Sequence, residues 1–196
     1  MKNYKLVGLT GTTGAGKGKV AQFFQNNGYA IINADFLARE IMDNQVVLSS
    51  ICNAFGEDVV TDGVLNRKLL AQRAFESKEK TQLLNSITHP FIGELFAEKL
   101  ESLQKDGYSK IVFDAPQLFE SKLNLLCDVV VSVLADADVR IKRIIERDSI
   151  TRQQAEKRIA VQFDDEFFRA NSDYVIENNS TLEKLKANTQ FVIDNI

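Results

Sequence analysis

Short apolar runs alternate with amphipathic segments along most of this chain. The runs cover residues 4–9, 29–32, 111–113, 129–134 and 174–176, and each is continuous rather than alternating. Continuous runs are typical of strands that are covered on both faces, as in a parallel sheet. After the first run, Val20, Phe23 and Phe24 recur at helical spacing. The pattern predicts an α/β fold in which helices cover both faces of an open, parallel, five-stranded sheet.

The stretch 36–107 has a different pattern. It contains no comparable apolar run, and residues such as Leu69 and Leu70 follow a helical period. We therefore predict an all-helical insertion, interrupted at His89-Pro90 because proline disrupts the interior of a helix.

Two later helices have predicted start signals. Thr151 with Gln154, and Ser180 with Glu183, have the spacing of a capping box, in which each side chain bonds the backbone of the other. We expect a helix to begin at each pair.

A glycine-rich loop follows the first predicted strand and precedes the first predicted helix. It matches the Walker A spacing at all but its last position, over Gly11, Thr12, Thr13, Gly14, Ala15, Gly16, Lys17 and Gly18. Glycines allow backbone N–H groups to face a phosphate, and Lys17 can reach the β- and γ-phosphates of ATP. The alternative is a turn that merely joins a strand to a helix. The motif and its context favour a P-loop NTPase-like fold that binds ATP.

The last position of this loop departs from the motif. Gly18 stands where Ser or Thr commonly ligates Mg²⁺, and Lys19 follows it within the predicted ATP site. The segment Gly-Ala-Gly-Lys-Gly resembles the loop of adenylate kinases, in which waters carry more of the metal's coordination. Asp114 ends the third predicted strand and is the candidate to hold Mg²⁺ through water.

Composition and charge restrict the partners. The chain has 196 residues, 44% of them hydrophobic and 26% charged, with a net charge of −3. This balance argues against a general electrostatic grip on nucleic acid. No apolar run approaches the roughly 18 residues of a membrane span, and the first residues lack the pattern of a signal peptide. We expect a cytoplasmic protein.

One segment is basic against this background. Residues 140–158 contain seven Lys or Arg and three acids, and Arg140, Arg143 and Arg147 fall on one face of a predicted helix. A lid that closes over ATP could bring such guanidinium groups to the transferred phosphoryl. The alternative is a charged face that is simply solvated.

Several short motifs follow one another in a fixed order from residue 6 to about residue 185. They are Gly8-Leu9-Thr10-Gly11, Asn33-Ala34-Asp35 with Arg39, Asp62-Gly63 with Leu65 and Arg67, His89-Pro90, Asp114-Ala115-Pro116-Gln117-Leu118-Phe119-Glu120, Arg147-Asp148, Gln162, and Asp173 with Asn178-Asn179. Together these motifs resemble the dephospho-coenzyme A kinase family. The resemblance implies transfer of the ATP γ-phosphoryl group to the ribose 3′-hydroxyl of dephospho-coenzyme A, which is the last step of coenzyme A synthesis.

Asp35 is the candidate for the acid that faces the acceptor hydroxyl, because it follows a predicted strand and phosphoryl transfer uses a carboxylate there. In the family, the second acid of an Asp-Ala-Asp motif has this role; Asp35 matches it, and Asn33 replaces the first acid. The alternative is that Asp35 caps the following helix.

The resemblance also implies roles for other residues. Arg143 and Arg147 match the catalytic arginines of the lid, and Arg39, Arg67, His89 and Pro116 belong to the substrate side. Arg67 also suits an anion, because guanidinium matches phosphate geometry. A lone histidine such as His89 is otherwise more often structural than catalytic.

The expected division follows from these assignments. Residues 1–35, 108–140 and 170–196 form the nucleotide-binding core, 36–107 the substrate-binding insertion and 141–169 the lid region. Two other functions stay open: another nucleotide or nucleoside kinase on the same scaffold, and a nucleotide-binding regulator that has lost catalysis.

Overall fold

The computed structural model describes residues 3–196 and divides into two compact units. The first unit contains Met1–Ile32 with Leu103–Ile196, and the second contains Asn33–Ser102.

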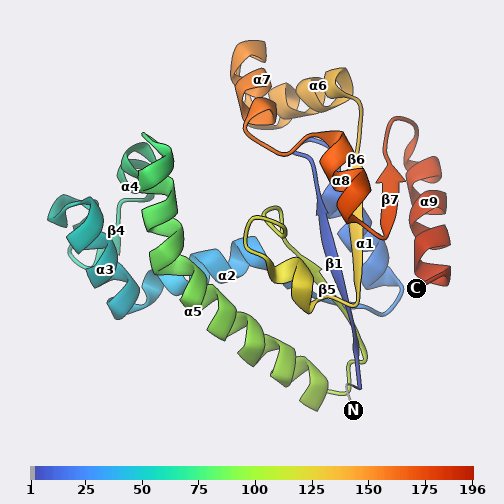
Figure 1. The fold of residues 1–196 in the computed structure, drawn as a ribbon, viewed down its shortest axis with the longest axis horizontal. Coiled ribbons are helices and arrows are strands. Elements are labelled where there is room, and N and C mark those ends of the chain that lie inside the picture. Colours follow the sequence, from blue (N-terminus) through green and yellow to red (C-terminus); the bar gives the residue numbers. More distant parts are fainter. Residues whose placement is uncertain (1–2) are drawn as a thin grey trace. The chain divides into compact units, whose positions relative to one another are not determined.

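The first unit is built on a five-stranded sheet (Figure 1). The strand order is β2-β5-β1-β6-β7, and β1 pairs in parallel with both β5 and β6, as β6 does with β7. The predicted sheet is therefore confirmed, with the glycine loop leaving its central strand. The strands are β1 (Lys5–Gly11), β2 (Ala30–Asn33), β5 (Lys110–Asp114), β6 (Val129–Leu134) and β7 (Tyr174–Glu177).

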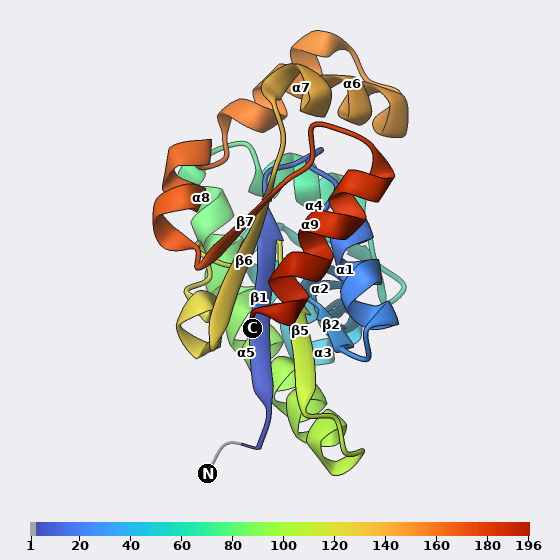
Figure 2. The ribbon, with the colours of Figure 1, turned by 90° about the vertical axis from the view of Figure 1, so that its right-hand side faces the viewer.

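Helices cover both faces of this sheet, as predicted (Figure 2). Helices α1 (Lys17–Asn26) and α9 (Leu182–Asp194) lie side by side on one face, and α8 (Asp165–Asn171) packs against β6 and β7 on the other. The core beneath α1 and α9 is apolar, and Phe24 is completely buried in it. A 3-10 helix, η3 (Leu123–Leu126), precedes β6.

Helices α6 (Ala137–Asp148) and α7 (Arg152–Ala160) form a hairpin in the same unit (Figure 1). The predicted capping box of Thr151 and Gln154 is confirmed at the start of α7. The prediction for α9 was wrong by one residue: Thr181, not Ser180, caps it and accepts a hydrogen bond from the backbone of Lys184.

The second unit is mainly helical and has its own apolar cluster around Val47, Ile51 and Phe55. Its elements, with the end of α5 extending into the first unit, are α2 (Ala34–Glu40), η1 (Ile41–Asp43), α3 (Gln45–Phe55), η2 (Glu57–Val59), β3 (Val60–Thr61), β4 (Val64–Leu65), α4 (Arg67–Ala74) and α5 (Lys78–Lys105).

Two expectations for this unit are wrong. The insertion is not all-helical, because β3 and β4 pair antiparallel around Asp62 and Gly63, whose φ values of 52° and 76° suit a two-residue hairpin turn. Nor does Pro90 break a helix, since it lies inside α5. Pro90 is exposed, so water can satisfy the carbonyl that loses its N–H partner.

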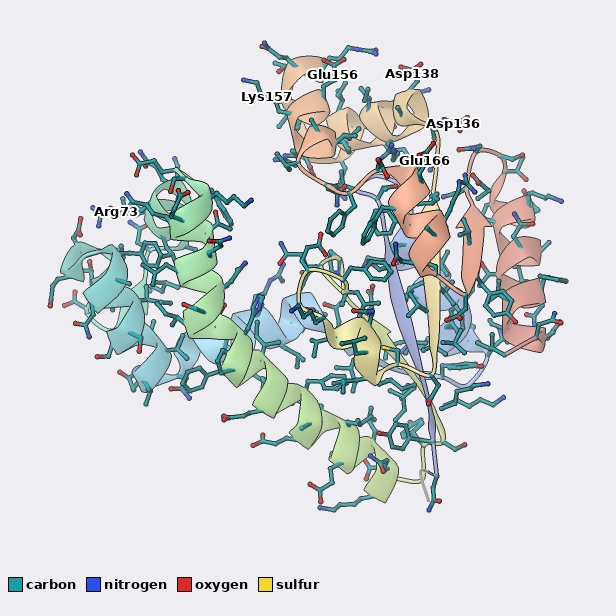
Figure 3. All side chains as sticks on the ribbon, in the orientation of Figure 1. Arg73, Asp136, Asp138, Glu156, Lys157 and Glu166 are labelled. Atoms are coloured by element: carbon teal, nitrogen blue, oxygen red, sulfur yellow. The ribbon has the colours of Figure 1, made fainter. Side chains whose placement is uncertain are left out.

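Arg73 ties α4 to the segment after α3 (Figure 3). Its guanidinium donates to the Phe55 carbonyl and to both carboxylate oxygens of Asp58, at 2.6–2.7 Å. Among residues 3–196, no helix combines the length and the apolarity that crossing a membrane requires.

Candidate functional site

The glycine loop adopts a conformation that most side chains would prevent. Gly14 and Gly16 have φ values of 80° and 97°. A Cβ on Gly14 would lie 2.8 Å from the Arg140 carbonyl oxygen, and a Cβ on Gly16 would collide with the amide of Asn178. The glycines are therefore required both by backbone angle and by close packing.

Backbone donors of the loop remain available to a ligand. Within the part of the chain that the structure describes, the N–H groups of Gly14, Gly16, Lys17 and Gly18 have no hydrogen-bond partner. A row of free N–H groups at a helix N-terminus is an anion-binding site. This argues against the alternative of a simple connecting turn.

Side chains from distant segments hold the loop in place. The Thr13 N–H donates to Gln162 Oε1 at 2.8 Å, and Asn178 Nδ2 donates to the Ala15 carbonyl at 2.6 Å. Arg143 Nη1 lies 3.4 Å from the carbonyl oxygens of Gly14 and Ala15. Asn178 and Arg143 occupy carbonyl groups of the loop and Gln162 occupies only the Thr13 N–H, so the N–H groups of Gly14, Gly16, Lys17 and Gly18 stay available to a ligand.

Lys17 and Asp114 form an ion pair beside the loop. Asp114 ends β5 and pairs in register with Leu9 of β1, so the strand that leads into the loop places the carboxylate next to the lysine. Both side chains are mostly buried, at 16% and 6% exposure. At Gly18, by contrast, an added Cβ would meet nothing within 4 Å.

The arginines on α6 have different partners despite their shared face. Arg140 is buried 3.4 Å from Asp165, and Arg143 contacts the loop. Arg147 donates to both carboxylate oxygens of Asp148, at 2.8 and 3.0 Å. These hydrogen bonds raise the pKa of Arg147 and lower that of Asp148. Of the two arginines predicted to be catalytic, Arg143 reaches the loop, whereas Arg147 is 60% exposed and bound to Asp148.

Arg152 joins the two helices of the hairpin. Figure 3 shows Asp138 on α6 and Glu156 on α7, and Arg152 donates to these carboxylates at 3.0 and 2.8 Å. Each exposed pair contributes little stability by itself. Buried apolar contacts such as Ile144 with Ala155 fix the helix packing beneath them.

Asp35 lies in the first turn of α2. The alternative that it caps this helix is wrong, because the Asn33 side chain accepts the hydrogen bond from the Phe36 N–H at 3.1 Å. The Asp35 carboxylate is exposed, and within residues 3–196 it forms no hydrogen bond or ion pair. It is therefore free to accept a ligand's hydroxyl group.

Asp35, Arg39 and Arg67 line a single cavity of about 290 Å³ in the second unit. Phe75 also lines it, and the remaining lining residues are apolar: Ala38, Met42, Leu65, Leu70, Ala71 and Leu84. Three of the predicted substrate residues thus come together at one apolar cavity with charged groups at its edge, the usual make-up of a small-molecule site.

The other two predicted substrate residues lie elsewhere. His89 is on α5 and does not line the cavity, and burial lowers the pKa of its imidazole. Pro116 belongs to the first unit, where its carbonyl accepts a hydrogen bond from Thr10 Oγ1 at 3.3 Å.

Gln162, Asn178 and Phe75 received no role from the sequence. The first two were noted only as parts of a family pattern, and nothing local indicates that they bind the loop. Phe75 gave no signal, because an aromatic residue after a helical segment usually belongs to a core.

Comparisons with known proteins agree with this geometry. The family model for dephospho-CoA kinase (CoaE) matches residues 5–184. A dephospho-CoA kinase of Corynebacterium glutamicum is 39% identical over 192 residues, covering 97% of this chain and 96% of that protein. The solved dephospho-CoA kinase of Campylobacter jejuni is 26% identical with a TM-score of 0.72, covering 100% and 97% of the two chains. A shikimate kinase from Acinetobacter baumannii, 14% identical with a TM-score of 0.58 over 99% and 93% of the chains, shares the fold. The chain therefore belongs to the dephospho-CoA kinase family.

Proposed function

We propose that this chain transfers the γ-phosphoryl group of ATP to the ribose 3′-hydroxyl of dephospho-coenzyme A, giving coenzyme A and ADP. Family membership supports the substrates, and the free N–H groups of Gly14, Gly16, Lys17 and Gly18, beside the Lys17 side chain, are the observation that carries phosphoryl transfer. The same proposal places the reaction in the cytoplasm as the final step of coenzyme A biosynthesis.

On the donor side, the residues from Gly11 to Lys19 hold the phosphates of ATP. The free N–H groups donate hydrogen bonds to the phosphate oxygens, and Lys17 neutralises charge on the β- and γ-phosphates. Arg143 lies against the loop and stabilises the charge that develops on the phosphoryl group during transfer. Arg147 joins it by exchanging Asp148 for the nucleotide.

On the acceptor side, Asp35 orients the 3′-hydroxyl and takes its proton. The 3′-oxygen then bonds to the γ-phosphorus as the bond to the β–γ bridging oxygen breaks, and ADP leaves. Arg39 and Arg67 bind the diphosphate of the acceptor, since guanidinium groups match phosphate oxygens. His89 and Pro116 complete the substrate side.

The donor site offers few protein groups that could hold magnesium. Asp114 is a buried carboxylate beside Lys17, and Gly18 offers no hydroxyl. No group of three or more His, Cys, Asp or Glu residues suited to a metal exists in residues 3–196. We infer that Asp114 holds Mg²⁺ through water, as suits an ion that keeps several waters and binds phosphate oxygens. When bound, Mg²⁺ neutralises charge on the β- and γ-phosphates.

The assignment of residues 141–169 as a lid belongs to the same proposal. Helices α6 and α7 pack on each other as one hairpin, and Arg143 connects that hairpin to the loop. Closure over ATP would exclude water from the reacting phosphoryl group.

The test is ADP release by the purified protein with ATP and Mg²⁺, with each of several acceptors. Dephospho-coenzyme A is compared with AMP, shikimate and nucleosides. We expect turnover with dephospho-coenzyme A alone. Turnover with another acceptor would show that the chain is a kinase with a different substrate. ATP binding without turnover on any acceptor would indicate a regulator.

A further inference from the structure

Phe75 is an aromatic side chain left in solvent at the edge of the acceptor cavity. It is 66% exposed and lines the cavity with Asp35, Arg39 and Arg67. Single exposed apolar residues are common and need no explanation. Phe75 differs because it is the aromatic member of a cavity whose other edge residues are charged.

Its backbone is held rigidly. Phe75 is the C-cap of α4, and its N–H donates to the Ala71 carbonyl at 3.1 Å. The preceding residue, Ala74, is completely buried, and its carbonyl accepts a hydrogen bond from Thr81 Oγ1 at 2.9 Å. A flat ring on a fixed backbone loses little conformational entropy when a ligand covers it.

Phe36 is equally exposed but differs in its surroundings. It also has 66% exposure, yet the Arg39 guanidinium lies over its ring, 5.8 Å from the centroid. Phe36 does not line the cavity. Phe75 is therefore the aromatic side chain that a ligand in this cavity can contact.

The chemistry of the acceptor accounts for such a face. If Asp35 receives the ribose hydroxyl and the two arginines receive the diphosphate, the remaining part next to the ribose is a flat heterocyclic base. Bases stack on aromatic side chains, and this contact is largely independent of base identity. Building on the proposed function, we propose that Phe75 is the platform on which the adenine of the acceptor stacks.

The test compares variants of Phe75 with a control of matched exposure. Phe191 lies on α9, is 65% exposed and does not line the cavity. We expect F75A to raise KM for dephospho-coenzyme A about tenfold, on the scale of lost base stacking, and to leave KM for ATP unchanged. F75L should lose nearly as much because it lacks a π-face, F75Y should stay within about twofold of the wild type, and F191A should change neither KM.

A second measurement separates stacking from a structural role. AMP and the 4′-phosphate of pantetheine, the two halves of the acceptor, are each used as competitors of dephospho-coenzyme A at saturating ATP. F75A should weaken inhibition by AMP alone. Equal weakening of both competitors, or a KM that F75A leaves unchanged, would overturn the proposal. If the wild type does not turn over dephospho-coenzyme A, the proposed function fails, and direct AMP binding to the wild type and F75A still decides the role of Phe75.

Discussion

The phosphate loop and the acceptor cavity differ in how their functional groups are held. Gln162, Asn178 and Arg143 fix the loop from distant segments, and these contacts leave four of its N–H groups without a partner in the described residues. In the cavity, Asp35 and Arg67 are exposed and form no hydrogen bond or ion pair within residues 3–196.

The difference indicates two ways of preparing for the same reaction. A preorganised loop stabilises charge without reorganising at the moment of transfer. Because no hydrogen bond or ion pair among the described residues holds Asp35 and Arg67, we expect these side chains to become ordered only when the ligand binds, at a cost in conformational entropy. Substitutions in the loop should therefore affect stability and catalysis together, and those in the cavity should affect catalysis alone.

Lys17→Met should have the largest effect. The substitution removes the positive charge that faces the β- and γ-phosphates, and it leaves the buried Asp114 carboxylate without its lysine. We expect kcat/KM to fall on the order of a thousandfold and the melting temperature to fall as well. Steady-state ADP release and thermal unfolding measure the two effects. Lys186→Met, an exposed lysine on α9, is the control; a stable Lys17 variant would show that the loop does not depend on this pair.

Asp35→Asn tests the acceptor cavity. Turnover should fall on the order of a hundredfold or more, because the acceptor hydroxyl loses its base. ATP affinity and the free energy of unfolding should stay nearly unchanged, since Asp35 is exposed and unpaired in the described chain. Asp43→Asn, at an exposed acid in η1, is the matched control. Full turnover in the Asp35 variant would refute its assignment.

Asn178→Ala should also lower both stability and catalysis, as expected for a residue that holds the loop, but by a smaller amount. The side chain is 7% exposed, and its removal leaves the Ala15 carbonyl with only the longer 3.4 Å contact from Arg143. We expect a loss of roughly 1–3 kcal/mol in stability and a KM for ATP raised several-fold, with KM for the acceptor unchanged. Asn171→Ala removes an exposed amide that bonds within α8 and should be nearly neutral. Equal losses of stability in the two variants would show that the contact between Asn178 and the loop contributes no more than an exposed hydrogen bond.

Gly18→Ser should have the smallest effect and is expected to be favourable. The added Cβ meets nothing within 4 Å, so the fold should be unchanged. A hydroxyl there replaces a metal-bound water, and we expect the Mg²⁺ concentration for half-maximal activity to fall about threefold. Calorimetric titration of Mg²⁺ with ADP bound provides a second readout. Gly16→Ala, which would strain a positive φ and strike Asn178, should instead destabilise the protein.

The sequence predicted the elements whose causes are local. The five strands and the glycine loop follow from apolar runs and from glycine chemistry, and the capping box of Thr151 and Gln154 spans only four residues. The errors arose where two local signals competed. Thr181 rather than Ser180 caps α9, Pro90 is tolerated in an exposed part of α5, and Asp62-Gly63 forms a hairpin too short to produce an apolar run.

The amino-acid sequence by itself determined the fold class, the phosphate loop and the family resemblance. The tertiary structure decided which side chains act on that loop: Gln162 and Asn178 bind it from 149 and 163 residues away in sequence, and Arg143 reaches it while Arg147 binds Asp148. It also brought Phe75 to the edge of a cavity that no motif describes. Local patterns encode backbone conformation, but a contact between distant segments depends on how the strands and helices pack, and packing emerges only when the whole chain is folded.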